Sequence, residues 1–126
     1  MLKTLIVEDN ASFRQLLNEI LCAQFPLMHV VEAEDVMEAM DKLEAVEPDL
    51  VFVDIRLPDG NGLDLTRSIK AQYFRTVIIV ITAYDLPEYR QAAYQNGANH
   101  FISKNSTSEA DVLTLVESII TRHDFH

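Results

Sequence analysis

The sequence has little cysteine, few basic residues and no long apolar run. Cys22 is the only cysteine among 126 residues, so no internal disulfide can form. Its place in an amphipathic stretch predicts a small buried apolar side chain, as an intracellular chain permits. No apolar run approaches the roughly 18 residues of a membrane span, and the N-terminus lacks a basic segment followed by an apolar one. We therefore expect a cytoplasmic protein without a membrane partner.

Charge and size narrow the class further. Lysine and arginine number 10 against 20 acidic residues, a formal net charge of −10, and this excess repels a phosphate backbone. Direct nucleic-acid binding by this chain is therefore not expected. A length of 126 residues with 48% hydrophobic content fits one globular domain, residues 1–126, because no shift in composition marks a linker.

Two periodicities alternate along the chain. Strand-like apolar runs occupy residues 2–7, 28–33, 50–54, 77–82 and 100–103. Apolar residues at helical spacing occupy residues 13–21, 36–43, 63–69, 89–93 and 112–119. Strict alternation with short connections predicts a doubly wound α/β fold of the flavodoxin-like kind. Its five-stranded parallel sheet has the order 2-1-3-4-5 and is flanked by five helices.

Local signals agree with these helix boundaries. Asn10 can cap the first helix, Pro87 suits a first helical turn, and Gly97 suits a helix C-terminus. The segment from Ser106 to Glu109 predicts a capping box before the last helix.

Acidic residues follow two of the strand-like runs. Glu8 and Asp9 follow the first run, and Asp54 follows the third. In this fold the C-terminal ends of the first and third strands are neighbours, so the three carboxylates should lie within a few ångströms at the ligand-binding edge. Two unit charges about 4 Å apart interact by roughly 4 kcal/mol near a protein surface, so the cluster needs a compensating cation. Carboxylate oxygens suit Mg²⁺, and the lack of nearby cysteine or histidine argues against zinc.

Other strands end in residues that complete such a pocket. Lys104 closes the fifth strand and is the obvious cationic partner of the acids, while Thr82 closes the fourth and adds a hydroxyl. Each residue taken alone has a simpler reading. Glu8 would fit a solvated loop acid, Thr82 an ordinary strand residue and Phe101 a core residue.

In combination, these residues resemble the receiver domain of two-component response regulators, over essentially the whole chain. The resemblance is carried, in order, by Glu8-Asp9, Asp54, the proline- and glycine-bearing loop Asp54–Gly62, Thr82-Ala83 and Lys104. It implies that Asp54 accepts a phosphoryl group from the phosphohistidine of a sensor histidine kinase or phosphotransfer protein. The chain would then be a stoichiometric phosphoacceptor rather than an enzyme, assisting its own phosphorylation and dephosphorylation.

The resemblance also implies a role for each site residue. The implied Mg²⁺ ligands are Asp9, Asp54, the backbone carbonyl of Arg56 and, through water, Glu8. The implied phosphate-binding groups are Thr82, the Ala83 backbone N–H and Lys104. Thr82 would turn toward the phosphoryl group and let Phe101 rotate inward. The surface of the fourth helix, fifth strand and fifth helix would then change its binding preference and could form a homodimer.

The chain departs from the commonest family pattern at two positions. Asn105 follows Lys104 where many members have proline, which leaves that loop less constrained. Phe101 replaces a tyrosine, so its ring gains packing but no phenolic hydrogen bond. The side chains of Arg56 and Tyr84 should lie at the mouth of the pocket.

Alternative functions remain open at this point. A Mg²⁺-dependent phosphatase with an aspartyl nucleophile would want a second acid where Arg56 stands, and a flavin carrier would need a Ser/Thr/Gly-rich loop in place of Asp9–Ser12. An unphosphorylated interaction scaffold and a free-standing phosphorelay intermediate would both keep this fold. The switch that the resemblance implies could itself control transcription, through a C-terminal DNA-binding domain outside this chain.

Overall fold

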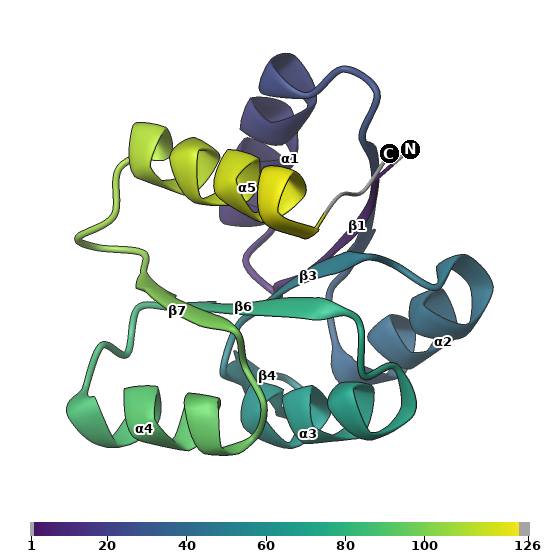
Figure 1. Cartoon of the computed structure of the whole chain (residues 1–126). Helices are drawn as coiled ribbons and strands as arrows, with labels where there is room; N and C mark the ends of the chain where they lie inside the picture. Colours follow the sequence, from purple (N-terminus) through teal and green to yellow (C-terminus); the bar gives the residue numbers. More distant parts are fainter. Residues whose placement is uncertain (1, 124–126) are drawn as a thin grey trace.

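Five parallel strands form the central sheet (Figure 1). The structure is a computed structural model that describes residues 2–123. The strands of this sheet are β1 (Lys3–Val7), β2 (His29–Ala33), β3 (Leu50–Val53), β6 (Val77–Thr82) and β7 (His100–Ser103). The helices are α1 (Ala11–Gln24), α2 (Val36–Val46), α3 (Gly62–Gln72), α4 (Pro87–Gln95) and α5 (Glu109–His123). The order β2-β1-β3-β6-β7 confirms the predicted flavodoxin-like fold.

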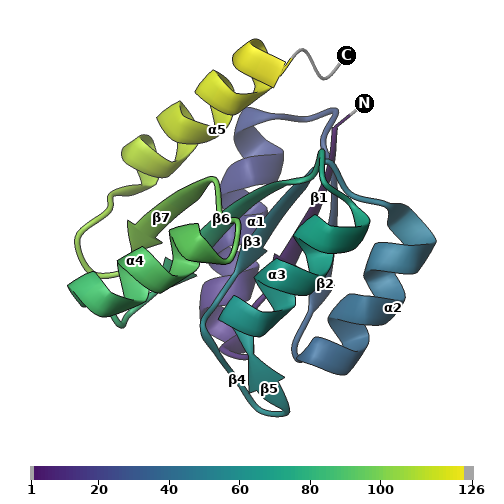
Figure 2. The same cartoon turned by 60° about the horizontal axis from the view of Figure 1, so that its bottom comes forward.

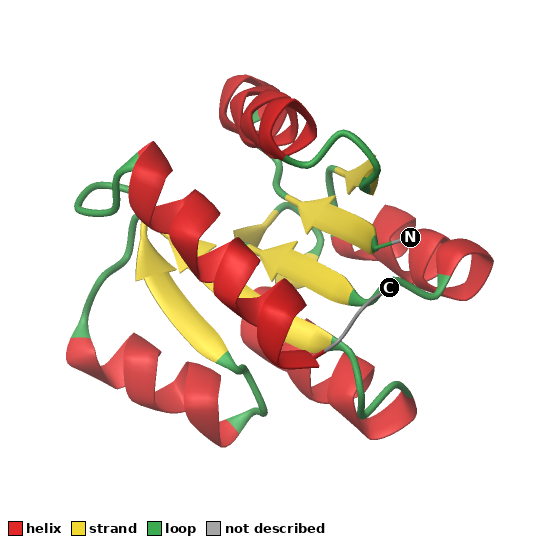
Figure 3. Ribbon diagram, turned by 45° about the horizontal axis from the view of Figure 1, so that its top comes forward, coloured by secondary structure: helices red, strands yellow, loops and turns green. Residues whose placement is uncertain are grey.

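The helices cover the sheet from both faces, as Figures 1 and 3 show: α1 and α5 on one side, and α2, α3 and α4 on the other. Side chains of the strands alternate between two apolar clusters. Leu5 and Val7 pack toward α2, α3 and α4, whereas Ile6 packs toward α1 and α5. Burial on both faces explains why the central strands are continuous apolar runs rather than alternating ones.

The local signals at helix ends are mostly confirmed. The Asn10 side chain accepts a hydrogen bond from the Phe13 amide, Pro87 opens α4, and Gly97 follows α4 with φ +103°, in the left-handed region that glycine tolerates. The predicted capping box is wrong by two residues. Ser108 and Asp111 form it instead, because the Ser108 Oγ accepts from the Asp111 amide at 3.1 Å.

Two further expectations are corrected. Cys22 is exposed rather than buried, and its Sγ lies 3.1 Å from the Asn18 Oδ1, because it falls outside the stripe of α1 that packs on the sheet. The loop after Asp54 also contains two short strands, β4 (Arg56–Leu57) and β5 (Gly60–Asn61), which pair as an antiparallel hairpin near the start of α3 (Figure 2). Within residues 2–123 we find no helix long and apolar enough to cross a membrane.

Gly62 holds this loop against the end of β3. Its amide donates to the Ile55 carbonyl at 2.7 Å, and a Cβ at this position would lie 2.0 Å from the Asp54 carbonyl oxygen. Only glycine therefore allows α3 to start so close to the backbone of Asp54.

We predict that Gly62→Ala lowers the free energy of unfolding by about 2 kcal/mol or more, because the added methyl group must displace backbone. Gly60→Ala is the matched control in the same hairpin. Its Cβ would meet only the Val36 side chain, 3.0 Å from Cγ2, and no backbone, so we expect a loss below about 1 kcal/mol. Urea unfolding measures both, and equal losses in the two variants would contradict the role of Gly62.

Candidate functional site

Three carboxylates meet at the C-terminal ends of β1 and β3. The two strands are neighbours in register, with Val7 opposite Val53, so the residues that follow them are neighbours as well. Glu8, Asp9 and Asp54 each offer an oxygen, and these atoms all lie within 4.8 Å of one another. Glu8 and Asp54 are buried, whereas Asp9 is exposed. The sheet therefore creates the acidic cluster that the sequence predicts.

Lys104 supplies a positive charge to this cluster from the end of β7. Its Nζ forms ion pairs with Glu8 and with Asp54, the latter at 3.0 Å from Oδ2. Its backbone amide donates to the Thr82 carbonyl at 2.9 Å, which continues the pairing of β6 with β7 beyond the strand. Burial by itself lowers the pKa of Lys104, but the hydrogen bonds to Glu8 and Asp54 outweigh it and raise this pKa. The ammonium therefore stays charged at neutral pH.

One lysine does not fully compensate the acids. Burial is the largest cause that raises the pKa of Glu8, to about 7, and the nearby Asp54 charge adds to it. Hydrogen bonds from Lys104 and from the Asn10 amide act in the opposite direction. A proton shared with Glu8 is thus one way to relieve the crowding, and a second cation is another.

The donor set fits a hard divalent cation. Among the residues that the structure describes, the Asp54 Oδ1 is buried and has no hydrogen-bond partner, although buried carboxylate oxygens are normally satisfied. Asp9 opens the cluster to solvent, and every candidate ligand atom is an oxygen. These properties suit Mg²⁺ and do not suit a soft metal.

Thr82 ends β6, the strand beside β3, and Ala83 follows it. Thr82 is buried and its Oγ1 accepts a hydrogen bond from the Tyr84 amide at 3.2 Å, while Ala83 is exposed. The Arg56 guanidinium lies 4.1 Å from the centre of the Tyr84 ring, so these two side chains form a cation–π pair next to the site. The Arg56 carbonyl belongs to the first residue of the hairpin after Asp54.

Phe101 is already buried, with 5% of its surface exposed. The Arg90 guanidinium lies 4.7 Å from the centre of its ring and also contacts the Asp85 carboxylate at 3.3 Å. In this structure the Phe101 ring therefore does not start from an exposed position from which it could rotate inward. Asn105 begins the next loop, and its amide donates to the Ser103 Oγ at 3.2 Å.

Sequence reasoning missed one residue beside the acids. Arg14 in α1 donates from Nη1 to the Glu8 carbonyl at 2.6 Å. Basic residues are common on amphipathic helices, and nothing in the sequence indicates that this one contacts the end of β1.

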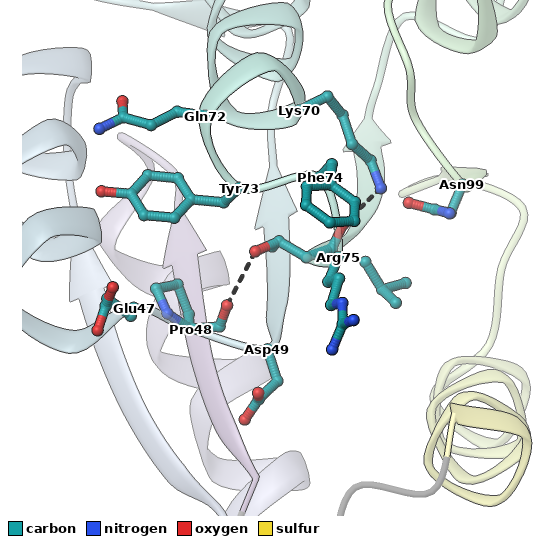
Figure 4. Close-up of a pocket in the computed structure, with 11 residues that line it drawn as sticks. Glu47, Pro48, Asp49, Lys70, Gln72, Tyr73, Phe74, Arg75 and Asn99 are labelled. Carbon is teal, nitrogen blue, oxygen red and sulfur yellow. Dashed lines mark hydrogen bonds between the residues drawn. The ribbon is translucent and has the colours of Figure 1, made fainter.

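A cavity of about 690 Å³ lies away from the acids, at the N-terminal ends of β3 and β6 (Figure 4). Two hydrogen bonds join residues of its lining: the Lys70 Nζ donates to the Thr76 carbonyl, and the Thr76 hydroxyl donates to the Pro48 carbonyl. Charges of both signs line this cavity and Phe74 is exposed beside it. Because this cavity lies at the opposite end of the sheet from the three carboxylates, it is not part of the acidic site.

Comparisons with known proteins identify the family. Residues 4–117 match the family model described as the response regulator receiver domain. The chain is 34% identical over 105 residues to the DNA-binding transcriptional activator DevR/DosR of Mycobacterium tuberculosis, covering 83% of this chain and 48% of that protein. It is 35% identical over 122 residues to a protein-glutamate methylesterase/protein-glutamine glutaminase of Methanococcus maripaludis, covering 94% and 33%. The chain thus spans about half or less of the length of these relatives.

A solved structure gives the same fold. The CheY-like response regulator receiver domain protein of Methanospirillum hungatei superposes with a TM-score of 0.89 at 24% identity, over 98% of this chain and 97% of that one.

We predict a pH-dependent stability that arises from Glu8 in the metal-free protein. Its folded pKa of about 7 lies above the ordinary value of 4.5, so its stabilising contribution is complete below about pH 4.5 and is lost as the pH rises through about 7. Between about pH 4.5 and pH 7, the free energy of unfolding of Glu8→Gln should fall by about 1–3 kcal/mol less than that of the wild type. Urea unfolding in a chelator measures it. Glu44→Gln, at an exposed acid of α2, should follow the wild-type profile, and a wild-type profile for Glu8→Gln would contradict the assignment.

Proposed function

The chain belongs to the response regulator receiver domain family, and from this premise we propose that residues 1–126 form one phosphorylation-activated signalling switch. In this proposal Asp54 accepts a phosphoryl group from a phosphohistidine of a sensor histidine kinase or phosphotransfer protein. The observation that carries it is the Asp54 carboxylate: one buried oxygen has no hydrogen-bond partner among the described residues, and the other contacts Lys104.

The proposed reaction needs no acid or base from the chain. A carboxylate oxygen of Asp54 bonds to phosphorus while the phosphorus–nitrogen bond of the phosphohistidine breaks. The electron pair goes to the imidazole nitrogen, which takes up a proton from water. Phosphoryl transfer of this kind depends on alignment and on neutralising the equatorial oxygens. The Lys104 ammonium, 3.0 Å from the Asp54 Oδ2, is close enough to serve that purpose.

Mg²⁺ is the proposed cofactor, and when bound it supplies positive charge for the phosphoryl oxygens in addition to that of Lys104. Its proposed protein ligands are Asp9, Asp54 and the Arg56 backbone carbonyl, with Glu8 acting through a water molecule. The contacts of Glu8 support this indirect role, because one of its oxygens pairs with Lys104 and the other accepts from the Asn10 amide.

Thr82, the Ala83 backbone N–H and Lys104 are the proposed phosphate-binding groups. The Thr82 hydroxyl accepts a hydrogen bond from the Tyr84 amide and keeps its own hydrogen free to donate to a phosphoryl oxygen. A turn of Thr82 toward the phosphoryl group would therefore act on the loop before α4 through this bond. Since Phe101 is already buried, phosphorylation would shift a population toward an inward ring that exists beforehand rather than create it. The proposed responding surface is α4, β7 and α5, which is also the proposed homodimer face.

The output of the switch is proposed from the relatives. One of them is a DNA-binding transcriptional activator, so control of transcription through a domain outside this chain is our first proposal, with no nucleic-acid contact by the receiver itself. A free-standing phosphorelay intermediate and an unphosphorylated scaffold are the alternatives. In each case we propose a cytoplasmic protein that is a stoichiometric phosphoacceptor rather than an enzyme, and that assists its own phosphorylation and dephosphorylation.

We predict that acetyl phosphate or phosphoramidate with Mg²⁺ adds one phosphoryl group to the chain, and that Asp54→Asn abolishes this gain because the amide is not a nucleophile. Intact-mass spectrometry is the measurement. Asp41→Asn, at an exposed acid of α2, is the matched control and should be modified like the wild type. Unreduced modification of Asp54→Asn would place the phosphoryl group elsewhere and remove Asp54 from the proposal.

We predict that Lys104→Ala keeps its Mg²⁺ binding but responds more weakly to phosphorylation, because the phosphoryl group loses its lysine contact while the carboxylate ligands remain. Backbone amide NMR shifts across α4, β7 and α5, recorded with and without phosphoramidate, measure the response. Lys42→Ala in α2 is the control. A full response in Lys104→Ala would exclude the lysine from the mechanism.

A further inference from the structure

Arg14 links three parts of the chain that meet at the acidic cluster. From α1, its Nη1 donates to the Glu8 backbone carbonyl at 2.6 Å and its Nε donates to the Glu32 Oε1 at 2.7 Å. The Arg14 side chain is 16% exposed and that of Glu32 is 35% exposed, so this ion pair is half-buried. Glu32 lies in β2, on the far side of β1 from β3.

The Glu32 end of this contact is itself held in place. The Asn18 Nδ2, one helical turn beyond Arg14, donates to the second Glu32 oxygen at 2.6 Å. Both carboxylate oxygens therefore have a donor from α1. Because the guanidinium is planar and its donors point in fixed directions, anchoring one edge on Glu32 also fixes where the other edge points. That direction is the Glu8 carbonyl.

Glu8 is the residue at which regular sheet pairing ends. Its amide still donates to the Ala33 carbonyl at 3.0 Å, but β1 has ended at Val7 and the chain turns toward α1. The Asn10 amide donates to the Glu8 Oε2 at 3.1 Å, and the Arg14 guanidinium donates to the Glu8 backbone carbonyl. Arg14 thus acts on the backbone of the turn that carries two of the three acids.

We propose that Arg14 is a positioning residue for the cation site, with Glu32 as its anchor. It fixes the turn of Glu8 and Asp9 so that both carboxylates face Asp54. The inference rests on the proposed Mg²⁺-dependent function.

A positioning role and a purely electrostatic role predict opposite effects on Mg²⁺ binding when Arg14 is removed. If Arg14 acted only through its positive charge, it would repel a divalent cation, and its removal would tighten Mg²⁺ binding. If it positions the turn, its removal weakens binding although the site becomes more negative. Arg14→Lys separates the two further, because it keeps the charge but loses the planar pair of donors.

The experiment compares Arg14→Gln, Arg14→Lys and Glu32→Gln with the wild type. We expect the Mg²⁺ dissociation constant, measured by calorimetry and by the amide NMR signals of Asp9 and Asp54, to rise about tenfold in both Arg14 variants. Glu32→Gln should give a smaller rise, since Arg14 keeps its bond to Glu8. Arg67→Gln is the matched control: the Arg67 Nε makes a similar bond to the Asn96 Oδ1, at 2.7 Å, but on α3 and away from the acids.

A metal-free measurement keeps the inference testable on its own. The amides of Glu8 and Asn10 donate to the Ala33 carbonyl and to the Glu8 Oε2. Their hydrogen exchange should be faster in Arg14→Lys than in the wild type, with exchange in the central strands unchanged. Wild-type exchange together with unchanged or tighter Mg²⁺ binding in the Arg14 variants would overturn the positioning role. A wild-type protein that binds no Mg²⁺ would instead overturn the proposed function, and the exchange result would still decide the role of Arg14.

Discussion

The sheet forces carboxylates together at the ends of β1 and β3, and the properties of the site follow from this unfavourable contact. Register pairs Val7 with Val53, so Glu8 and Asp54 meet whether or not their charges favour it. The free energy that tolerates this repulsion comes from apolar burial elsewhere, because the strands that lead to the site are buried on both faces. A local conflict of this kind within an otherwise consistent fold is typical of functional sites.

Partial compensation gives the site its chemical character. Lys104 contacts two of the acids, yet the pKa of Glu8 remains raised to about 7 and one Asp54 oxygen has no hydrogen-bond partner in the described chain. A fully neutralised cluster would be an inert ion-pair network. An undercompensated one attracts a cation and then a group with negatively charged oxygens, which is the sequence of events that the family assignment leads us to propose.

Most of the fold and the acidic cluster could be predicted, because strands buried on both faces are continuous apolar runs and parallel strands end at one edge. The errors concern details that periodicity does not carry. Ser106 and Ser108 both begin a capping pattern, so the sequence could not choose between them. The hairpin strands are two residues long, too short to show alternation. Arg14 meets its partner Glu32 only through the packing of α1 beside β2, which no local pattern encodes.

The buried ring of Phe101 limits which part of the proposed switch can respond. Only 5% of its surface is exposed, and Arg90 covers the ring while contacting Asp85. The proposed switch therefore does not begin from a Phe101 ring in solvent. Its conformational work would fall instead on the loop that joins β6 to α4, where the Thr82 hydroxyl accepts a hydrogen bond from the Tyr84 amide.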